Sequence, residues 1–379
     1  MSVIAGIHGV LGEHCYPQAD ITQAFAQVVS PDGSFHKVIE RIHEATGIQT
    51  RHLALPLSGY ANLENFGAAN DTYIRLALDL AEVAVTGALD SAGLTAADVS
   101  LILATSITGI AVPSIDARLV SRLGLPADVK RLPIFGLGCV AGAAGIARLH
   151  DYLIGHPDDI AVLVSVELCS LTIQRDDTSM ANIVASGLFG DGAAAVVMVG
   201  ERRVAQMGLT GPRVIASRSR MYPDTERTMG WDIGGSGFRI VLSPGVAEVI
   251  TTYIGDDVSN FLSSQELTSS DIAHWVCHPG GPKVLHAMES ALELNDGQLD
   301  ITWRSLAAIG NLSSASVLHV LRDTIEGTGA ELSPSTPFAS ATSTGTSAST
   351  TISAPVSGTF GLLTAMGPGF CVELVLLQW

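Results

Sequence analysis

The chain has 379 residues, of which 47% are hydrophobic and 15% charged, and its formal net charge at pH 7 is −17. This length allows two domains, or one large two-part domain with a well-buried core. The negative charge argues against nucleic acid and acidic membranes as partners. The five cysteines are scattered without a C-x-x-C pair, which argues against a zinc site and a disulfide scaffold and fits a reducing cytoplasm.

The N-terminal residues "MSVIAGIHGVLGEHCYP" have no basic region and no long apolar run, so we expect no signal peptide. The most apolar stretch, residues 160–173, is too short to span a bilayer and contains Glu167. We therefore expect a cytoplasmic protein without stable membrane insertion.

A cysteine stands between a glycine pair and a run of small residues in "GLGCVAGAAGIARL". Gly136 and Gly138 allow a sharp turn, and the residues after Cys139 predict a helix with little side-chain bulk. Glycine weakens a helix, so we expect this one to pack closely inside the protein. A cysteine at a helix start is favoured as a thiolate by unpaired N–H groups and the positive end of the dipole. Cys139 is therefore either an activated nucleophile or, like most single cysteines, a small apolar core residue.

Three blocks of the chain recur in the same order. Residues 94–106 and 267–279 both read Leu-Thr-x-x-Asp-[Val/Ile] followed by an apolar strand. The same offset places "GLGCVAGAAGIARL" over "IGNLSSASVLHVL", and "FGDGAAAVVMVG" resembles "MGPGFCVELVLL" further on. The repetition predicts two copies of one α/β unit, residues 1–202 and 203–379, each with a mostly parallel sheet covered by helices.

Between the last predicted helix and the last strand, residues 333–358 are rich in Ser, Thr, Ala, Pro and Gly and nearly uncharged. This composition predicts a long, flexible loop.

Five segments together resemble the type III polyketide synthases, the chalcone synthase-like enzymes of the thiolase superfamily: "GLGCVAGAAG", "LFGDGAAAVV", "CHPGGPKVL", "GNLSSASVLHVL" and "AMGPGFCVELVLL". The resemblance runs from the N-terminal region to the C-terminus. It implies a thiolase fold, which is a duplicated α/β architecture of five layers, αβαβα, with mostly parallel mixed sheets. It also implies a homodimer.

The resemblance implies a catalytic set of Cys139, His278 and Asn311. The Cys139 thiolate, with its pKa depressed by a cationic His278, would take an acyl group from coenzyme A. His278 and Asn311 would then stabilise the enolate formed when malonyl-CoA loses carbon dioxide. Repeated decarboxylative Claisen condensation and cyclisation would follow, with CoA thioesters as substrates and with neither a cofactor nor a metal. Taken singly, His278 could be a core histidine and Asn311 a helix cap.

Other positions match the family around the substrate. Phe189 would lie at the base of the substrate entrance, where an apolar ring favours loss of carbon dioxide through desolvation, and Phe238 would be a second gatekeeper. The remaining matches are of three kinds. Thr108, Thr172 and Gly230 would line the cavity, and Val112 would reach the partner's cavity in a homodimer. Lys37 and Arg41 would be the cations that bind the CoA phosphates. Arg51 is the next candidate for the phosphates, and all three cations could equally be solvated surface charges.

The starter acyl group is the open question. Because the matched cavity residues are small, we expect room for a long chain and prefer a fatty acyl-CoA starter. The alternative is malonyl-CoA as both starter and extender, which gives a small phenolic such as tetrahydroxynaphthalene or phloroglucinol. Ketoacyl synthase III also uses Cys-His-Asn, but its histidine is usually followed by Gln-Ala-Asn, whereas Pro-Gly-Gly follows His278. A protein of this fold that only binds acyl-CoA would not decarboxylate malonyl-CoA.

Overall fold

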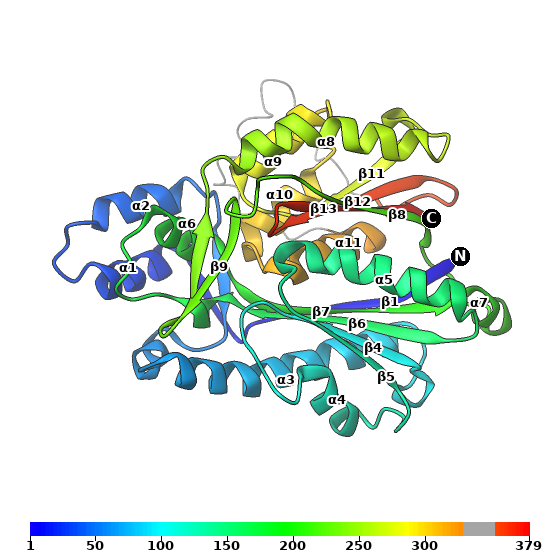
Figure 1. Ribbon diagram of the computed structural model, residues 1–379, viewed down its shortest axis with the longest axis horizontal. Helices are drawn as coiled ribbons and strands as arrows, with labels where there is room; N and C mark the ends of the chain where they lie inside the picture. Colours follow the sequence, from blue (N-terminus) through cyan, green and yellow to red (C-terminus); the bar gives the residue numbers. More distant parts are fainter. Residues whose placement is uncertain (329–352) are drawn as a thin grey trace.

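The computed structural model describes residues 1–328 and 353–379, and its elements stack in five layers (Figure 1). Helices α3 and α4 cover one outer face, and α8 and α9 cover the other. Helices α5 and α11 lie between the two halves of the sheet. This arrangement confirms the expected five-layered thiolase fold. The loop expected over residues 333–358 lies outside the described residues as far as residue 352.

The helices begin and end at these residues: α1 (Gln18–Val29), α2 (His36–Glu44), α3 (Phe66–Ser91), α4 (Ile115–Leu123), α5 (Ala141–Gly155), α6 (Met180–Leu188), α7 (Glu201–Met207), α8 (Val246–Ser263), α9 (Pro282–Ala291), α10 (Asp300–Ile309) and α11 (Ser316–Glu326). The strands are β1 (Ser2–Leu11), β2 (His14–Pro17), β3 (Thr50–Leu53), β4 (Leu101–Thr105), β5 (Lys130–Ile134), β6 (Ile160–Leu168), β7 (Asp191–Gly200), β8 (Arg213–Met221), β9 (Met229–Gly234), β10 (Gly237–Leu242), β11 (Ile272–Cys277), β12 (Phe360–Gly367) and β13 (Cys371–Gln378).

Nine strands of the described chain form one mixed sheet in the order β11-β12-β13-β8-β1-β7-β6-β4-β5. Its halves meet where β1 pairs with β8 through Ser2 with Val214 and Val3 with Arg213. In each half, one strand is antiparallel to its neighbours: β7 in the first half and β13 in the second. Strands β4, β5 and β6 are parallel to one another, and so are β11 and β12. The expectation of a mixed sheet is confirmed: β11–β12, β4–β5 and β4–β6 are parallel pairs, and the other neighbouring strands of this sheet are antiparallel.

The internal repeat is visible in local structure. Thr95 and Asp98 form a capping box before β4, and Thr268 and Asp271 form the same capping box before β11. A short 3₁₀ turn, η3 (Gly138–Val140), leads into α5, and its counterpart η6 (Ser313–Ala315) leads into α11. The two central helices are therefore equivalent elements that face each other, as the matched blocks predict.

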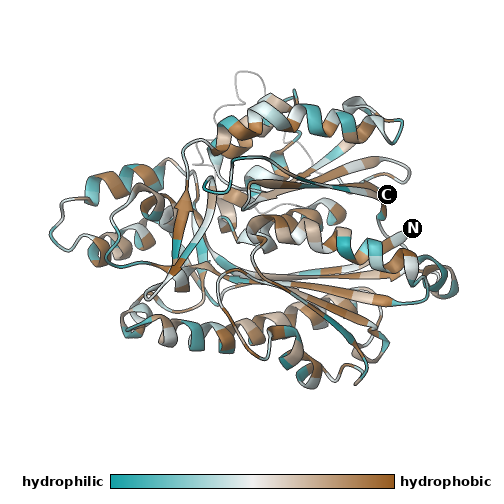
Figure 2. Ribbon diagram, viewed as in Figure 1, coloured by the Kyte–Doolittle hydropathy of each residue, from teal (hydrophilic) through white to brown (hydrophobic). Residues whose placement is uncertain are grey.

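The small residues of α5 are required by close packing. A Cβ atom on Gly142 would lie 2.3 Å from the carbonyl oxygen of Ser314, and one on Gly145 would lie 2.6 Å from a methyl group of Leu163. Both distances are shorter than real contacts, so larger side chains would force α5 away from η6 and β6. Figure 2 shows the same burial, with hydrophobic strands enclosed between helices whose outer faces are hydrophilic.

A lobe at one end of the molecule carries α1, α2 and α6 (Figure 1). Helices α1, α2 and α6 pack around a small core that includes Phe25, Val29, Ile39 and Ile183. The β9–β10 hairpin forms a separate two-stranded sheet beside α6. No helix in the described ranges combines the length and the apolar character that crossing a membrane requires.

Candidate active site

A cavity of about 570 Å³ opens between the lobe, the β9–β10 hairpin and the start of α5. Its volume is in the range that encloses small organic ligands. Of the residues predicted from the sequence, these line it: Arg51, Cys139, Thr108, Thr172, Phe189, Gly230 and Phe238. Ser313 also lines the cavity, whereas His278 and Asn311 are not among its lining residues.

Cys139 lies in the η3 turn, and only 7% of it is exposed. Its Sγ donates to the hydroxyl oxygen of Ser313 at 3.7 Å. Burial raises the pKa of the thiol to about 12, although the hydrogen bond to Ser313 opposes the rise. This direction is opposite to the expected depression of the pKa by a cationic His278, because the burial of the sulfur outweighs the hydrogen bond with Ser313.

His278 follows β11, and its backbone N–H donates to the Thr364 carbonyl at 2.9 Å. The side chain is buried, and neither ring nitrogen has a hydrogen-bond partner among the described residues. Burial lowers its pKa to about 3, so the ring is neutral at pH 7. No hydrogen bond joins the His278 ring to the sulfur of Cys139 among the described residues. Buried polar atoms without partners are rare, and two on one ring suit a site that a ligand completes.

Asn311 stands between α10 and η6, where its side-chain carbonyl accepts the backbone N–H of Ser313 at 2.8 Å. That bond fixes the amide so that Nδ2, whose nearest acceptor is the Gly280 carbonyl at 3.4 Å, remains available as a donor. The Gly280 N–H in turn donates to the His278 carbonyl at 2.9 Å. Ser313, Asn311 and the loop after β11 thus connect Cys139 to His278.

Phe189 ends α6 and forms an isolated parallel bridge with Asn311. Its carbonyl accepts from Nη1 of Arg51 at 2.8 Å. Arg51 is only 2% exposed, and burial lowers its pKa to about 10 against the opposing charge of Asp191. Arg51 is therefore not a solvated surface charge: it lines the cavity, and its guanidinium donates to backbone carbonyls inside the protein.

Three other predicted residues lie on the surface of the protein. Lys37 and Arg41 are exposed on α2, and Val112 is 91% exposed. None of the three lines the cavity.

Two predicted cavity residues use their hydroxyl groups within the protein. Thr108 donates to a carboxylate oxygen of Glu167 at 2.9 Å, and Thr172 donates to the Cys169 carbonyl at 2.7 Å. Glu167 is fully buried, and its carboxylate also accepts from the Ile107 N–H at 3.1 Å and from the hydroxyl of Ser314. These hydroxyls fix the cavity wall and are not free for a substrate.

Aromatic side chains that no sequence motif indicated make much of the wall. Tyr60, Phe66 and Trp231 line the cavity together with Phe238. Phe66 meets Phe238 edge to face, with ring centroids 5.4 Å apart, and the Trp231 ring lies 6.0 Å from Phe238. The space beside the small predicted residues is thus bounded by large rings, which differs from the open cavity that we expected.

Comparison with known proteins agrees with this geometry. Residues 2–202 match the N-terminal domain of chalcone and stilbene synthases, and residues 213–333 match their C-terminal domain. The chain is 53% identical over 376 residues to a 1,3,6,8-tetrahydroxynaphthalene synthase of Streptomyces peucetius subsp. caesius, covering 99% of this chain and 93% of the relative. It is 30% identical to a phloroglucinol synthase of Pseudomonas fluorescens, covering 96% and 97%. The crystal structure of the 1,3,6,8-tetrahydroxynaphthalene synthase of Streptomyces coelicolor superposes with a TM-score of 0.86, at 28% identity, over 100% of this chain and 99% of that one.

Proposed function

Because the chain belongs to the chalcone and stilbene synthase family and is a type III polyketide synthase, we propose that it makes a tetrahydroxynaphthalene-type product from malonyl-CoA alone, with Cys139 as the nucleophile. Enzymes of this class are acyltransferases that use CoA thioesters. The observation that carries the catalytic assignment is the connected group that leads from Cys139 and Ser313, which line the cavity, through Asn311 to the loop of His278 behind them.

Acyl loading begins from neutral groups. The Cys139 thiol gives its proton to a ring nitrogen of His278, which is neutral and free to accept it. The thiolate attacks the thioester carbonyl of the substrate, and the carbon–sulfur bond to coenzyme A breaks. The departing thiolate recovers the proton from the imidazolium.

Chain extension uses the same histidine with Asn311. When a second malonyl-CoA loses carbon dioxide, the electron pair of the broken carbon–carbon bond moves to the thioester oxygen as an enolate. A ring N–H of His278 and Nδ2 of Asn311 are the donors for that oxygen. The enolate carbon attacks the Cys139 thioester, a carbon–carbon bond forms, and the thiolate is released. The ring of Phe189 lines this region and disfavours a carboxylate beside it.

Two observations favour malonyl-CoA over a fatty acyl-CoA as the starter. The relative from Streptomyces peucetius, 53% identical over nearly the whole chain, is a tetrahydroxynaphthalene synthase. The cavity wall is aromatic around Phe238 and Trp231, and aromatic rings pair favourably with flat aromatic products in stacked or edge-to-face arrangements. We therefore replace the fatty acyl preference with the malonyl-only alternative.

The finer assignments extend this proposal. Lys37 and Arg41, exposed one helical turn apart on α2, would meet the phosphates of coenzyme A outside the cavity. The 91% exposure of Val112 supports a homodimer in which a second copy covers it, because a solvated valine of this kind gains free energy on burial. Sedimentation of the purified protein and of Val112→Asp tests the dimer.

The deciding experiment is mass spectrometry of the products from purified protein with malonyl-CoA alone and with added acyl-CoA starters of increasing chain length. A tetrahydroxynaphthalene-type product from malonyl-CoA alone, unchanged by the added starters, is expected. Incorporation of a long acyl chain in preference to malonyl-CoA would overturn the malonyl-only assignment.

A further inference from the structure

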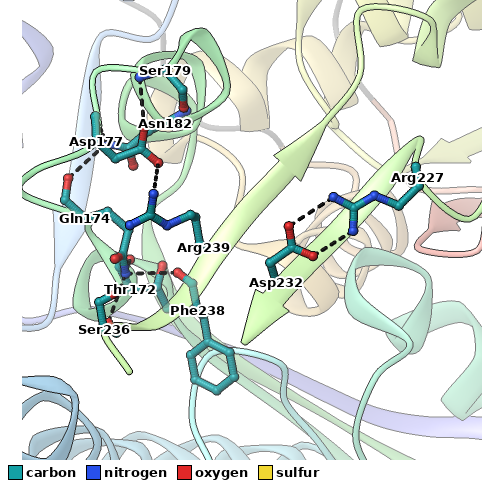
Figure 3. A network of polar contacts seen from close by, with 10 residues as sticks. All are labelled: Thr172, Gln174, Asp177, Ser179, Asn182, Arg227, Asp232, Ser236, Phe238 and Arg239. Atoms are coloured by element: carbon teal, nitrogen blue, oxygen red, sulfur yellow. Dashed lines mark hydrogen bonds and ion pairs between the residues drawn. The ribbon is translucent and has the colours of Figure 1, made fainter. Parts of the chain in front are cut away.

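Gln174 lies between the catalytic half of the cavity and the β9–β10 hairpin, and it is only 4% exposed. Its side-chain Nε2 has backbone carbonyls on two sides. On its own loop it donates to Thr172 at 3.2 Å, and on the hairpin it donates to Ser236 at 3.2 Å and to Phe238 at 3.1 Å (Figure 3). A single buried amide thus ties the hairpin to the loop that follows Cys169.

The loop that carries Gln174 is itself anchored to α6. The side-chain Nδ2 of Asn182 donates to the Gln174 carbonyl at 3.0 Å and to the Asp177 carbonyl at 2.7 Å. The hydroxyl of Ser179 caps the helix by accepting the Asn182 N–H at 3.3 Å. Because Phe189 ends the same helix, α6 joins the anchor of Gln174 to the bridge with Asn311.

The hairpin needs such a tether because it is outside the main sheet. It pairs only with itself among the described strands, and its tip runs "IGGSGF" from Ile233. A Cβ atom on Gly234 or Gly235 would meet nothing within 4 Å, so no other part of the described chain packs against these two residues of the tip. Yet the hairpin supplies Trp231 and Phe238 to the cavity wall.

We propose that Gln174 is a positioning residue that holds the β9–β10 hairpin as a rigid wall of the cavity and thereby restricts the growing polyketide to one chain length. Gln174 acts through Phe238 and Trp231, which face the chain, and takes no part in bond formation. This inference rests on the proposed function, in which the polyketide grows from Cys139 into this cavity.

The hairpin also offers a matched control. Arg227 and Asp232 form a two-pronged ion pair, at 2.6 and 3.0 Å, away from the cavity wall (Figure 3). Their side chains are 72% and 54% exposed, so the pair holds the hairpin only weakly.

The test uses Gln174→Met and Gln174→Glu, which keep the length of the side chain but remove the amide donors. The readout is the ratio of products of other chain lengths to the main product, which is independent of the overall rate. We expect this ratio to rise about tenfold in both variants, since buried carbonyls lose their donor. Amide hydrogen exchange over residues 229–242 should become faster, while Arg227→Gln keeps the product ratio of the unmodified protein.

The glutamate variant separates the role of the donor from simple filling of space. At about pH 8 its carboxylate repels the three carbonyls, whereas a protonated carboxyl at about pH 6 donates one hydrogen bond, because the carbonyls raise its pKa. The product ratio of Gln174→Glu should therefore approach that of the unmodified protein at the lower pH, and that of Gln174→Met should not. A purely structural role predicts no such difference.

Three results have distinct meanings. If the unmodified protein makes no polyketide that depends on Cys139, the proposed function fails. If it makes one main product and both Gln174 variants make the same one, only the role of Gln174 is refuted. If Gln174→Met does not fold, the pH dependence of Gln174→Glu decides.

Discussion

Phe189 from the first half of the chain and Asn311 from the second form a parallel bridge beside the cavity. The Asn311 N–H donates to the carbonyl of Leu188, and its own carbonyl accepts the N–H of Gly190, both at 2.9 Å. The residue proposed to stabilise the enolate and the ring proposed to disfavour the carboxylate are thereby held in fixed register. Two halves that repeat one structural unit contribute one part of the site each.

Replacing Cys139 by Ala should reduce polyketide formation by at least about a thousandfold, because no other group forms the acyl-enzyme. Product formation from malonyl-CoA is the measurement. Cys15→Ala is the control, since Cys15 is exposed and lies outside the cavity. Comparable product from both variants would remove Cys139 from the mechanism.

Replacing Asn311 by Asp should lower kcat about a hundredfold or more, because the enolate loses one donor. The new side chain still accepts the Ser313 N–H that Oδ1 accepts at 2.8 Å, so the variant should fold, with a lower thermal midpoint because a carboxyl oxygen replaces the donor to the Gly280 carbonyl. Steady-state kinetics with malonyl-CoA and a melting curve provide both numbers. An unchanged kcat would leave Asn311 with a purely structural role.

The free energy of unfolding should fall as the pH drops below about 6.5, and His278 should account for part of this fall. The folded state keeps this ring neutral, with a pKa of about 3, whereas the unfolded chain has the ordinary value of 6.5. Below pH 6.5 the unfolded state therefore binds a proton that the folded state does not. Above 6.5 the group contributes no pH dependence.

Relative to His278→Gln, the unmodified protein should lose up to about 1.4 kcal/mol of unfolding free energy for each pH unit below 6.5. Denaturant titrations at several pH values measure this difference. Parallel curves for the two proteins would show that the ring is not buried as described.

Trp231→Ala should open the cavity wall, because removing the ring frees volume beside Phe238. A medium-chain acyl-CoA should then serve as starter at a rate about tenfold above that of the unmodified protein. Competition between malonyl-CoA and octanoyl-CoA, followed by mass spectrometry, is the measurement. Asp232→Ala, on the adjacent exposed position, should leave starter choice unchanged. Equal starter use by all three proteins would contradict the role of the wall.

Gly142→Ala should destabilise the protein by about 1–3 kcal/mol, since the new methyl group would lie 2.3 Å from the Ser314 carbonyl. Gly155→Ala is its control in the same helix, because a Cβ atom there meets nothing within 4 Å and alanine favours a helix by up to about 1 kcal/mol. Denaturant unfolding distinguishes the two. Equal stability of both variants would contradict the close packing of α5 on η6.

The sequence by itself determined the features that depend on local composition and spacing. The small residues around Gly142 require a close neighbour wherever the helix lies, and the repeated Leu-Thr-x-x-Asp pattern forms the same capping box in both halves. The order of the motifs was enough to identify the family and its five-layered fold. It also indicated Cys139, His278 and Asn311 as candidate catalytic residues.

Only the tertiary structure decided the properties that depend on distant segments. The protonation of Cys139 and His278 follows from burial, which no local motif records, and the fold also turns the Arg51 guanidinium inward to the carbonyl of Phe189. The cavity wall depends on Trp231 and Gln174, which are separated along the chain and meet through the hairpin. Solvent exclusion and backbone contacts between remote residues are set by packing, so spacing in the sequence cannot supply them.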